Sequence, residues 1–237
     1  MCGIHCTISS QGDKKSTSSS TTTFLNNRGP DSTQGYRLEI KGPATGCAKP
    51  VHLSFISTVL SLRGSNIVSQ PLIDHESGCV LCWNGEAWKL SNEVVAGNDS
   101  KAVFSLLLQA ADKANNRIGG STHDEVINAL SLITGPYAFA FYDGFSRRLY
   151  YGRDCLGRRS LVKCTDESGD IVLSSICDTS RGEGWSEVEA DGVYVVELAS
   201  MCRRSNTESR NSETFDVSRI PYVYQDQASD SSSYLVC

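Results

Sequence analysis

The chain has 237 residues, of which 39% are hydrophobic and 21% are charged, and its formal net charge is −5. This length allows one sizeable core, and the composition is typical of a globular protein. The negative net charge argues against a nucleic-acid-binding surface, and no apolar stretch is long enough to cross a bilayer. We therefore expect neither nucleic acid nor membrane as a partner, and the lack of a secretion signal favours a cytoplasmic location.

The first third of the chain is predicted to hold strands and one polar insertion. Residues 3–9 are apolar and β-branched enough for a strand that begins beside Cys2. Residues 16–23 are all Ser or Thr, and we interpret them as a flexible surface insertion with too little hydrophobicity to pack. Further strands are expected at 52–62 and 80–83.

The middle of the chain predicts two helices followed by more strands. Apolar side chains at helical spacing begin at Asn98 or Asp99, and a second helix opens at Thr122 with Glu125 completing a capping box. The expected strands after them are 137–142, 149–152, 161–164, 171–176 and 193–198. This order predicts an α+β fold with sheets packed on each other and helices outside. The polar segment from 199 to 237 is interpreted as a tail or linker.

Ten cysteines occur in the chain, and we expect them to be reduced thiols because this length needs no disulfide staples. Cys79 and Cys82 form a C-x-x-C sequence, but the residues between them favour a strand, which points positions three apart to opposite faces. No second pair completes four zinc ligands, so we expect no metal site.

Cys2 is the most informative residue of the sequence. Methionine aminopeptidases remove Met1 when the next side chain is small, and the chain would then begin with a thiol beside a free α-amine. That amine has an ordinary pKa near 7.7–8.0, so it can act as a general base toward its own thiol. Cysteine is also commonly a small buried hydrophobe, so the hypothesis needs substrate-binding residues elsewhere.

Several short motifs contain candidate substrate-binding residues. In chain order they are Cys2-Gly3-Ile4, Arg28-Gly29-Pro30-Asp31, Leu62-Arg63-Gly64, Gln70-Pro71-Leu72, Trp83-Asn84-Gly85-Glu86, Asn98-Asp99 and Gly152-Arg153-Asp154. Together they resemble the glutaminase domain of class II glutamine amidotransferases of the asparagine synthetase type, which are N-terminal nucleophile hydrolases. The segment 59–64 is most similar to the branch called asparagine synthetase domain-containing proteins. The resemblance covers residues 2–198 and implies a four-layer αββα sandwich of two antiparallel sheets.

The resemblance implies a role for each matching residue in glutamine hydrolysis. Cys2 would be the nucleophile, and the Asn84 side chain with the Gly85 backbone N–H would bind the oxyanion. Taken alone, Asn84-Gly85 favours a hairpin turn, and only the other motifs favour the oxyanion site. Arg28 would support the loop near the nucleophile or simply form a turn, and the Gly152-Arg153-Asp154 motif would be structural.

The remaining matches concern the amino-acid end of glutamine. Arg63 would bind the α-carboxylate through two parallel hydrogen bonds, although a surface ion pair is the usual role of an arginine. Asp99 would bind the α-ammonium, although an Asp at this position is also typical of a helix cap. Glu86 would assist Asp99.

Complete asparagine synthetases carry a second domain with a Ser-Gly-Gly-x-Asp-Ser loop that binds ATP, and this sequence has none. We expect no cofactor in this chain; ATP and Mg²⁺ would serve a missing synthetase domain or a separate subunit that accepts the ammonia. Two other interpretations stay open. The chain could be a catalytically weak regulatory or interaction module with the same fold, or a metal- or redox-responsive cysteine protein.

Overall fold

The computed structural model describes residues 1–10, 17–41, 50–116, 122–167, 169–178, 184–201, 215–223 and 235–236. The first sheet has six strands in the spatial order β13 (Ser186–Glu187), β11 (Val162–Thr165), β12 (Ile171–Ser174), β1 (Gly3–Ser9), β3 (Val51–Val59) and β2 (Ser32–Ile40). The second has seven, in the order β16 (Leu235–Val236), β15 (Val217–Val223), β14 (Gly192–Glu197), β10 (Arg148–Arg153), β9 (Tyr137–Asp143), β5 (Val80–Gly85) and β4 (Leu72–Ile73). A small sheet joins β7 (Glu93–Val94), β6 (Lys89–Leu90) and β8 (Ile133–Thr134). The helices are α1 (Ser19–Arg28), α2 (Asp99–Asn116), α3 (Thr122–Ser131) and the short α4 (Leu198–Met201).

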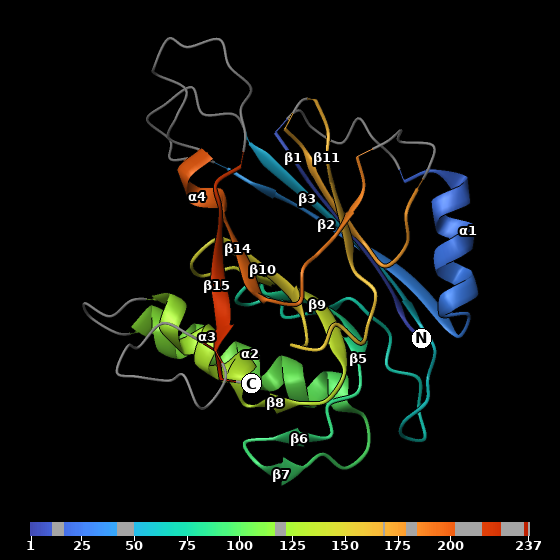
Figure 1. Cartoon of the computed structure of the whole chain (residues 1–237), viewed down its shortest axis with the longest axis vertical. Helices are drawn as coiled ribbons and strands as arrows, with labels where there is room; N and C mark the ends of the chain where they lie inside the picture. The colour runs from blue at the N-terminus through green and yellow to red at the C-terminus, as the bar shows by residue number, and fades with distance from the viewer. Residues whose placement is uncertain are drawn as a thin grey trace.

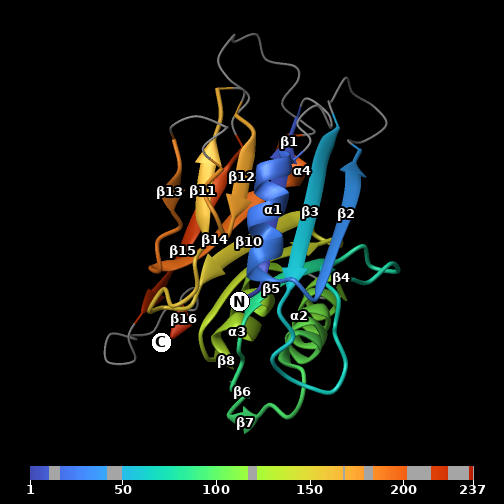
Figure 2. The same cartoon turned by 90° about the vertical axis from the view of Figure 1, so that its right-hand side faces the viewer.

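These elements stack in four layers. One buried apolar cluster lies between the two large sheets, and another lies between the second sheet and helices α2 and α3. Helix α1 lies across the outer face of the first sheet, beside β1 and β3 (Figure 2). Helices α2 and α3 lie side by side against the second sheet (Figure 1). Strand pairing within both large sheets is antiparallel except between β15 and β16, so the predicted αββα sandwich of two antiparallel sheets is confirmed.

Strand β9 shows why the sequence folds into these layers. Tyr137, Phe139 and Phe141 point into the cluster under α2 and α3, while the alternate residues point into the cluster between the sheets. All seven residues of β9 are buried, as expected for a central strand covered on both faces. Strands β9 and β10 form an antiparallel hairpin in which Tyr142 pairs with Leu149.

The prediction of a flexible Ser/Thr insertion at 16–23 is wrong for its described part, because residues 19–28 form α1. Residue 16 lies outside the described residues. The helix is stabilised by its surroundings rather than by helix propensity. Ser18 caps it by accepting a hydrogen bond from the Thr21 backbone N–H, Asp178 accepts hydrogen bonds from the hydroxyls of Ser18 and Thr21, and Leu25 is fully buried.

The prediction that residues 199–237 form a tail or linker is also wrong for strands β15 and β16, which belong to the second sheet. Strand β15 pairs with β14 from Val217 to Pro221, inside the second sheet. The Tyr222 hydroxyl donates a hydrogen bond to the Arg153 carbonyl oxygen. The polar residues around this strand lower the average hydrophobicity of the segment and hide a short strand whose Ile220 and Tyr222 pack on the core.

Three further predictions concern the start of helix α3, the C-x-x-C segment and metal ligands. Helix α3 begins at Thr122 as predicted; the Thr122 side chain lies outside the described residues, and Glu125 forms an ion pair with Lys113 at 2.8 Å. Strand β5 begins at Val80, directly after Cys79, and Cys79 and Cys82 lie in different core clusters, which confirms that the two thiols point to opposite faces. No group of three metal-ligating side chains occurs among the described residues.

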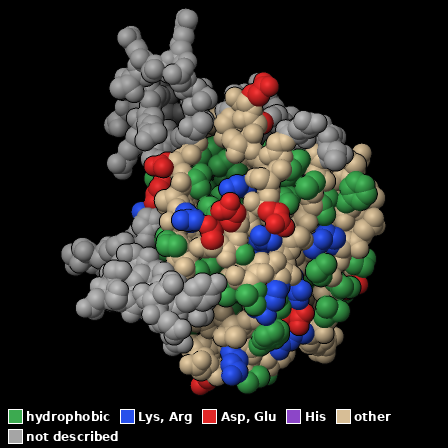
Figure 3. Space-filling model, in the orientation of Figure 1, with side chains coloured by type: hydrophobic (Ala, Val, Ile, Leu, Met, Phe, Trp, Pro, Cys, Tyr) green, Lys and Arg blue, Asp and Glu red, His purple; other side chains and the backbone are tan. Residues whose placement is uncertain are grey.

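Among the described residues, no helix is long and apolar enough to cross a membrane. On the face shown in Figure 3, Lys and Arg side chains are interspersed with Asp and Glu.

Candidate functional site

A cleft of about 570 Å³, its open mouth included, lies where strands of both large sheets end. Cys2 precedes β1, the loop 60–63 follows β3, and residues 84–86 lie at the end of β5. The first residue of α2, Asp99, closes the cleft from the helix side. All six residues proposed from the sequence line this cleft: Cys2, Arg63, Asn84, Gly85, Glu86 and Asp99.

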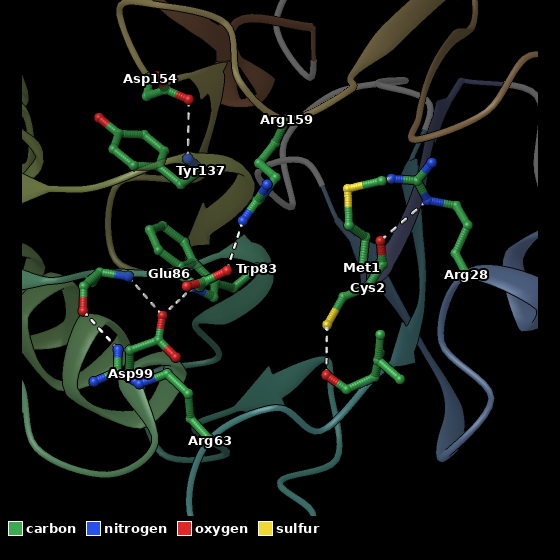
Figure 4. A network of polar contacts seen from close by, with 12 residues as sticks. Met1, Cys2, Arg28, Arg63, Trp83, Glu86, Asp99, Tyr137, Asp154 and Arg159 are labelled. Carbon is green, nitrogen blue, oxygen red and sulfur yellow. Dashed lines mark hydrogen bonds and ion pairs between the residues drawn. The ribbon is translucent and has the colours of Figure 1, made fainter.

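The Cys2 thiol lies at the wall of the cleft and is half-buried. It donates a weak hydrogen bond to the Leu60 carbonyl oxygen at 3.8 Å. Arg28 holds the Cys2 backbone by donating from Nε to its carbonyl oxygen at 3.3 Å (Figure 4). Burial, with a smaller contribution from the negative charge of Asp99, raises the pKa of the Cys2 thiol above its ordinary value. The thiol is therefore protonated at neutral pH and needs a base to become a nucleophile.

Asn84 has an unused donor. The residue is 1% exposed, and its Nδ2 has no hydrogen-bond partner among the described residues. A buried amide N–H without a partner is costly and uncommon in folded proteins. Asn84 also pairs with Ala138 inside the second sheet, so the strand fixes its backbone. The hairpin-turn alternative for Asn84 and Gly85 is excluded, because both belong to β5.

Gly85 leaves no room for a side chain. A Cβ atom there would lie 2.6 Å from the Tyr137 Cβ and 2.8 Å from the Pro136 carbonyl oxygen. We expect Gly85→Ala to lower the free energy of unfolding by about 1–3 kcal/mol, because the sheet must shift to relieve the overlap. Urea unfolding followed by circular dichroism measures this.

The matched control is Gly35→Ala in the edge strand β2, where the new Cβ would lie 3.4 Å from its nearest neighbour. That substitution should leave stability unchanged or slightly raised, because it removes backbone freedom from the unfolded chain. Equal stability of the two variants would contradict the close packing at Gly85.

Arg63 is anchored by backbone groups rather than by a surface ion pair. Its Nη1 donates to the Ala87 carbonyl oxygen at 2.9 Å, and its Nη2 donates to the Val95 carbonyl oxygen at 2.6 Å. A guanidinium has five N–H donors, so others stay available to a ligand in the cleft. The two carbonyls fix the plane of the group, which is what two-point binding of a carboxylate requires.

Asp99 is not the helix cap. The Asn98 side chain accepts the hydrogen bond from the Lys101 backbone N–H at 3.4 Å, so Asn98 caps α2 and Asp99 is its first helical residue. Asp99 is 5% exposed, and its Oδ2 accepts from the Trp83 indole N–H at 3.0 Å and from the Ala87 backbone N–H at 2.8 Å. The hydrogen bonds to this carboxylate from described residues all end on Oδ2, which leaves Oδ1 for a ligand.

Glu86 has a partner that the sequence did not indicate. Arg159 donates from Nη2 to Glu86 Oε1 at 2.8 Å, and both side chains line the cleft (Figure 4). No motif of the sequence gave Arg159 a role in the site. No local pattern could have found it, because the pair joins positions 73 residues apart.

Gln70 is a second supporting residue without an assigned role. It is 3% exposed, and its Oε1 accepts from the Trp83 backbone N–H at 2.7 Å. Strand β4 begins only at Leu72 and pairs with Leu81 and Val80 of β5, so the Gln70 side chain replaces a backbone partner for Trp83, nearer the cleft. The Gln70-Pro71-Leu72 motif was the available signal, but it carried no chemistry of its own.

The predicted structural role of the Gly152-Arg153-Asp154 motif is supported by its contacts. Asp154 is 3% exposed and accepts hydrogen bonds from the backbone N–H groups of Tyr137, Leu156 and Arg158. It thereby ties the exit of β10 to the start of β9.

Comparison with known proteins gives relatives for most of the chain, although no protein-family model matches it. The chain is 31% identical over 205 residues to asparagine synthetase domain-containing protein 1 of Mus musculus, covering 84% of this chain and 30% of the relative. The Homo sapiens protein of that name is 30% identical over 205 residues, covering 84% and 29%. Human asparagine synthetase [glutamine-hydrolyzing] is 24% identical over 186 residues, covering 77% and 29%.

The chain thus spans 29–30% of the length of these relatives. The similarity confirms the resemblance that the motifs indicated. Among solved structures, glutamine phosphoribosylpyrophosphate amidotransferase from B. subtilis superposes with a TM-score of 0.48 and 17% identity, covering 92% of this chain and 49% of that one.

Proposed function

Because the chain is homologous to the asparagine synthetase domain-containing proteins, we propose that it is a glutaminase domain that hydrolyses L-glutamine to glutamate and ammonia. One observation carries the proposal. A thiol, an unpartnered amide donor, an anchored guanidinium and two carboxylates line one cleft, where they match the groups of glutamine: Cys2, Asn84, Arg63, Glu86 and Asp99.

The proposed reaction begins after removal of Met1, which is 51% exposed and lines the cleft. The free α-amine of Cys2 takes the thiol proton as sulfur attacks the side-chain amide carbon of glutamine. The amide oxygen becomes an oxyanion held by Asn84 Nδ2 and the Gly85 backbone N–H. The C–N bond then breaks, the α-ammonium returns its proton to the leaving ammonia, and a γ-glutamyl thioester stays on Cys2. Water, deprotonated by the same amine, attacks the thioester and releases glutamate and the thiol.

The substrate is oriented in this proposal by its amino-acid end. Arg63 would bind the α-carboxylate, and Asp99 Oδ1 with Glu86 would bind the α-ammonium. Both Arg63 and Asp99 hydrogen-bond to the backbone of Ala87, so the two subsites are fixed relative to each other. A site held by backbone contacts keeps its geometry before substrate arrives, which lowers the entropy cost of binding.

The pH dependence of turnover tests the role of the amine. Because burial raises the pKa of the Cys2 thiol, the thiol alone would limit activity until well above neutral pH. With the α-amine as base, kcat/KM should instead rise with pH through about 7.7–8.0 and then level off, since the protonated amine cannot accept the proton. A coupled glutamate assay between pH 6 and 10 measures the profile. A rise confined to the region above pH 9 would contradict the amine as base.

The basic test of the proposal is glutamate release from glutamine by purified protein, with intact mass measured on the same sample. Loss of Met1 together with glutamate release would support the enzyme. A folded protein that binds glutamine without releasing glutamate would favour the regulatory module. Retention of Met1 would leave no free amine at Cys2 and would count against the mechanism.

The fate of the ammonia belongs to the same proposal. We place the reaction in asparagine biosynthesis, with a synthetase domain or subunit as the ammonia acceptor. The hydrolysis as written needs no cofactor, and ATP and Mg²⁺ would act only at that acceptor. Adding a purified synthetase partner with aspartate and ATP, and measuring asparagine, would test the assignment.

A further inference from the structure

The loop after β10 directs two neighbouring arginines to different places. Asp154 accepts hydrogen bonds from the Arg158 backbone N–H at 3.1 Å and from the Arg158 Nε at 2.8 Å. Gly157, directly before the two arginines, has a φ of +62°, a conformation that favours glycine. Arg158 therefore lies over the Trp88 ring, 5.2 Å from its centroid, while Arg159 reaches into the cleft.

In the cleft, Arg159 forms a hydrogen bond with only one of the two carboxylate oxygens of Glu86. The hydrogen bond at 2.8 Å ends on Oε1, so Oε2 stays available on the same carboxylate. The Arg159 side chain is 19% exposed and the Glu86 side chain 40% exposed. A pair this open to water contributes little to stability. Its consequence is geometric, because Glu86 follows the end of β5 and could otherwise rotate toward solvent.

We propose that Arg159 is a positioning residue that orients Glu86 and so sets the affinity and selectivity of the cleft for substrates that carry an α-ammonium group. This role rests on the proposed function. Arg159 acts through Glu86 rather than on the reacting atoms. Its removal should therefore weaken recognition of the ammonium group and leave the chemistry at Cys2 unchanged.

A pair of ligands isolates this effect. Glutamine carries the α-ammonium, whereas glutaramate has the same carboxylate and amide but no amino group. In a Cys2→Ala background, which binds without turning over, calorimetry should show that Arg159→Met weakens glutamine binding by about tenfold, the usual scale for a hydrogen bond to a charged group. Glutaramate binding should stay within about twofold of the parent.

Further variants show whether the effect passes through Glu86. Glu86→Gln should weaken glutamine binding by a similar factor, and the double variant should be no worse than Glu86→Gln alone, because coupled residues are not additive. Arg159→Lys should restore part of the affinity. In the active enzyme, Arg159→Met should raise KM for glutamine with kcat nearly unchanged.

Arg148→Met is the matched control. It removes the same charge and breaks an arginine–glutamate pair with Glu197 at 2.6 Å, whose arginine is 18% exposed, outside the cleft. It should change neither ligand's affinity.

The outcomes separate the two proposals. If no variant, including the parent, binds glutamine, the proposed function is wrong and this role falls with it. If the parent binds glutamine and Arg159→Met binds it equally well, only the role of Arg159 is wrong. An equal loss for glutamine and glutaramate would also overturn that role, because Arg159 would then act on a group common to both ligands.

Discussion

Replacing Cys2 with alanine is expected to lower glutamate release from glutamine by at least about a thousandfold, the scale seen when a covalent nucleophile is removed. Among the described residues, no other thiol lines the cleft. The fold should persist, because Cys2 precedes β1 and its side chain makes only a weak hydrogen bond to the Leu60 carbonyl oxygen. The measurement is a coupled glutamate assay on wild type and variant, with circular dichroism to verify folding.

Cys155→Ala is the matched control, since Cys155 is also half-buried but lines a different cavity. It should keep full activity. A glutamine-mimicking diazoketone sharpens the test, because it should add to Cys2 and spare the exposed thiol of Cys177. Exposure alone would favour Cys177, so exclusive labelling of Cys2 requires binding in the cleft. Residual activity in Cys2→Ala, or labelling that follows exposure, would overturn the nucleophile assignment.

The sequence predicted those parts of the fold whose signals are local and strong. Strand β1 was predicted with its observed bounds, and the alternation in β9 and the helical spacing in α2 were sufficient to find both elements. Helix α1 was missed because its Ser/Thr composition disfavours a helix, and the contacts with Asp178 that stabilise it come from 157 or more residues away. Strand β2 was also missed, because as an edge strand it exposes most of its residues and lacks a clear pattern.

The candidate site likewise contains residues that the sequence indicates and residues that it does not. Residues that motifs mark, such as Cys2 and Asn84, could be assigned from the sequence, because each belongs to a short recognisable stretch. The anchors of those residues could not. The Ala87 and Val95 carbonyls that hold Arg63 carry no side-chain signal, and Arg159 reaches Glu86 only through a loop whose shape depends on Asp154. Motifs therefore predict which groups line the cleft, and the fold determines how those groups are held.

Asn84 is expected to show opposite effects on activity and stability. Asn84→Ala and Asn84→Leu should each lower kcat by about two to three orders of magnitude, because each removes the donor that would bind the oxyanion. The unpartnered Nδ2 has a desolvation cost of about 1–3 kcal/mol in the folded protein. Asn84→Leu keeps a similar volume without the polar atoms. This variant should therefore leave the free energy of unfolding unchanged or raise it. Steady-state kinetics and urea unfolding on the same preparations measure both quantities.

Asn84→Asp supplies the control for shape. It keeps the size of the side chain but exchanges the amide donor for a carboxylate oxygen, whose charge would repel an oxyanion in a buried position. Its loss of kcat should therefore equal or exceed that of Asn84→Ala, while glutamine binding in a Cys2→Ala background should change much less than kcat, since the donor acts on the transition state. If instead Asn84→Leu unfolds more readily and its activity falls only in proportion to the unfolded fraction, Asn84 is a packing residue of β5. The Gly85 backbone N–H would then be the one donor left of the two proposed for the oxyanion.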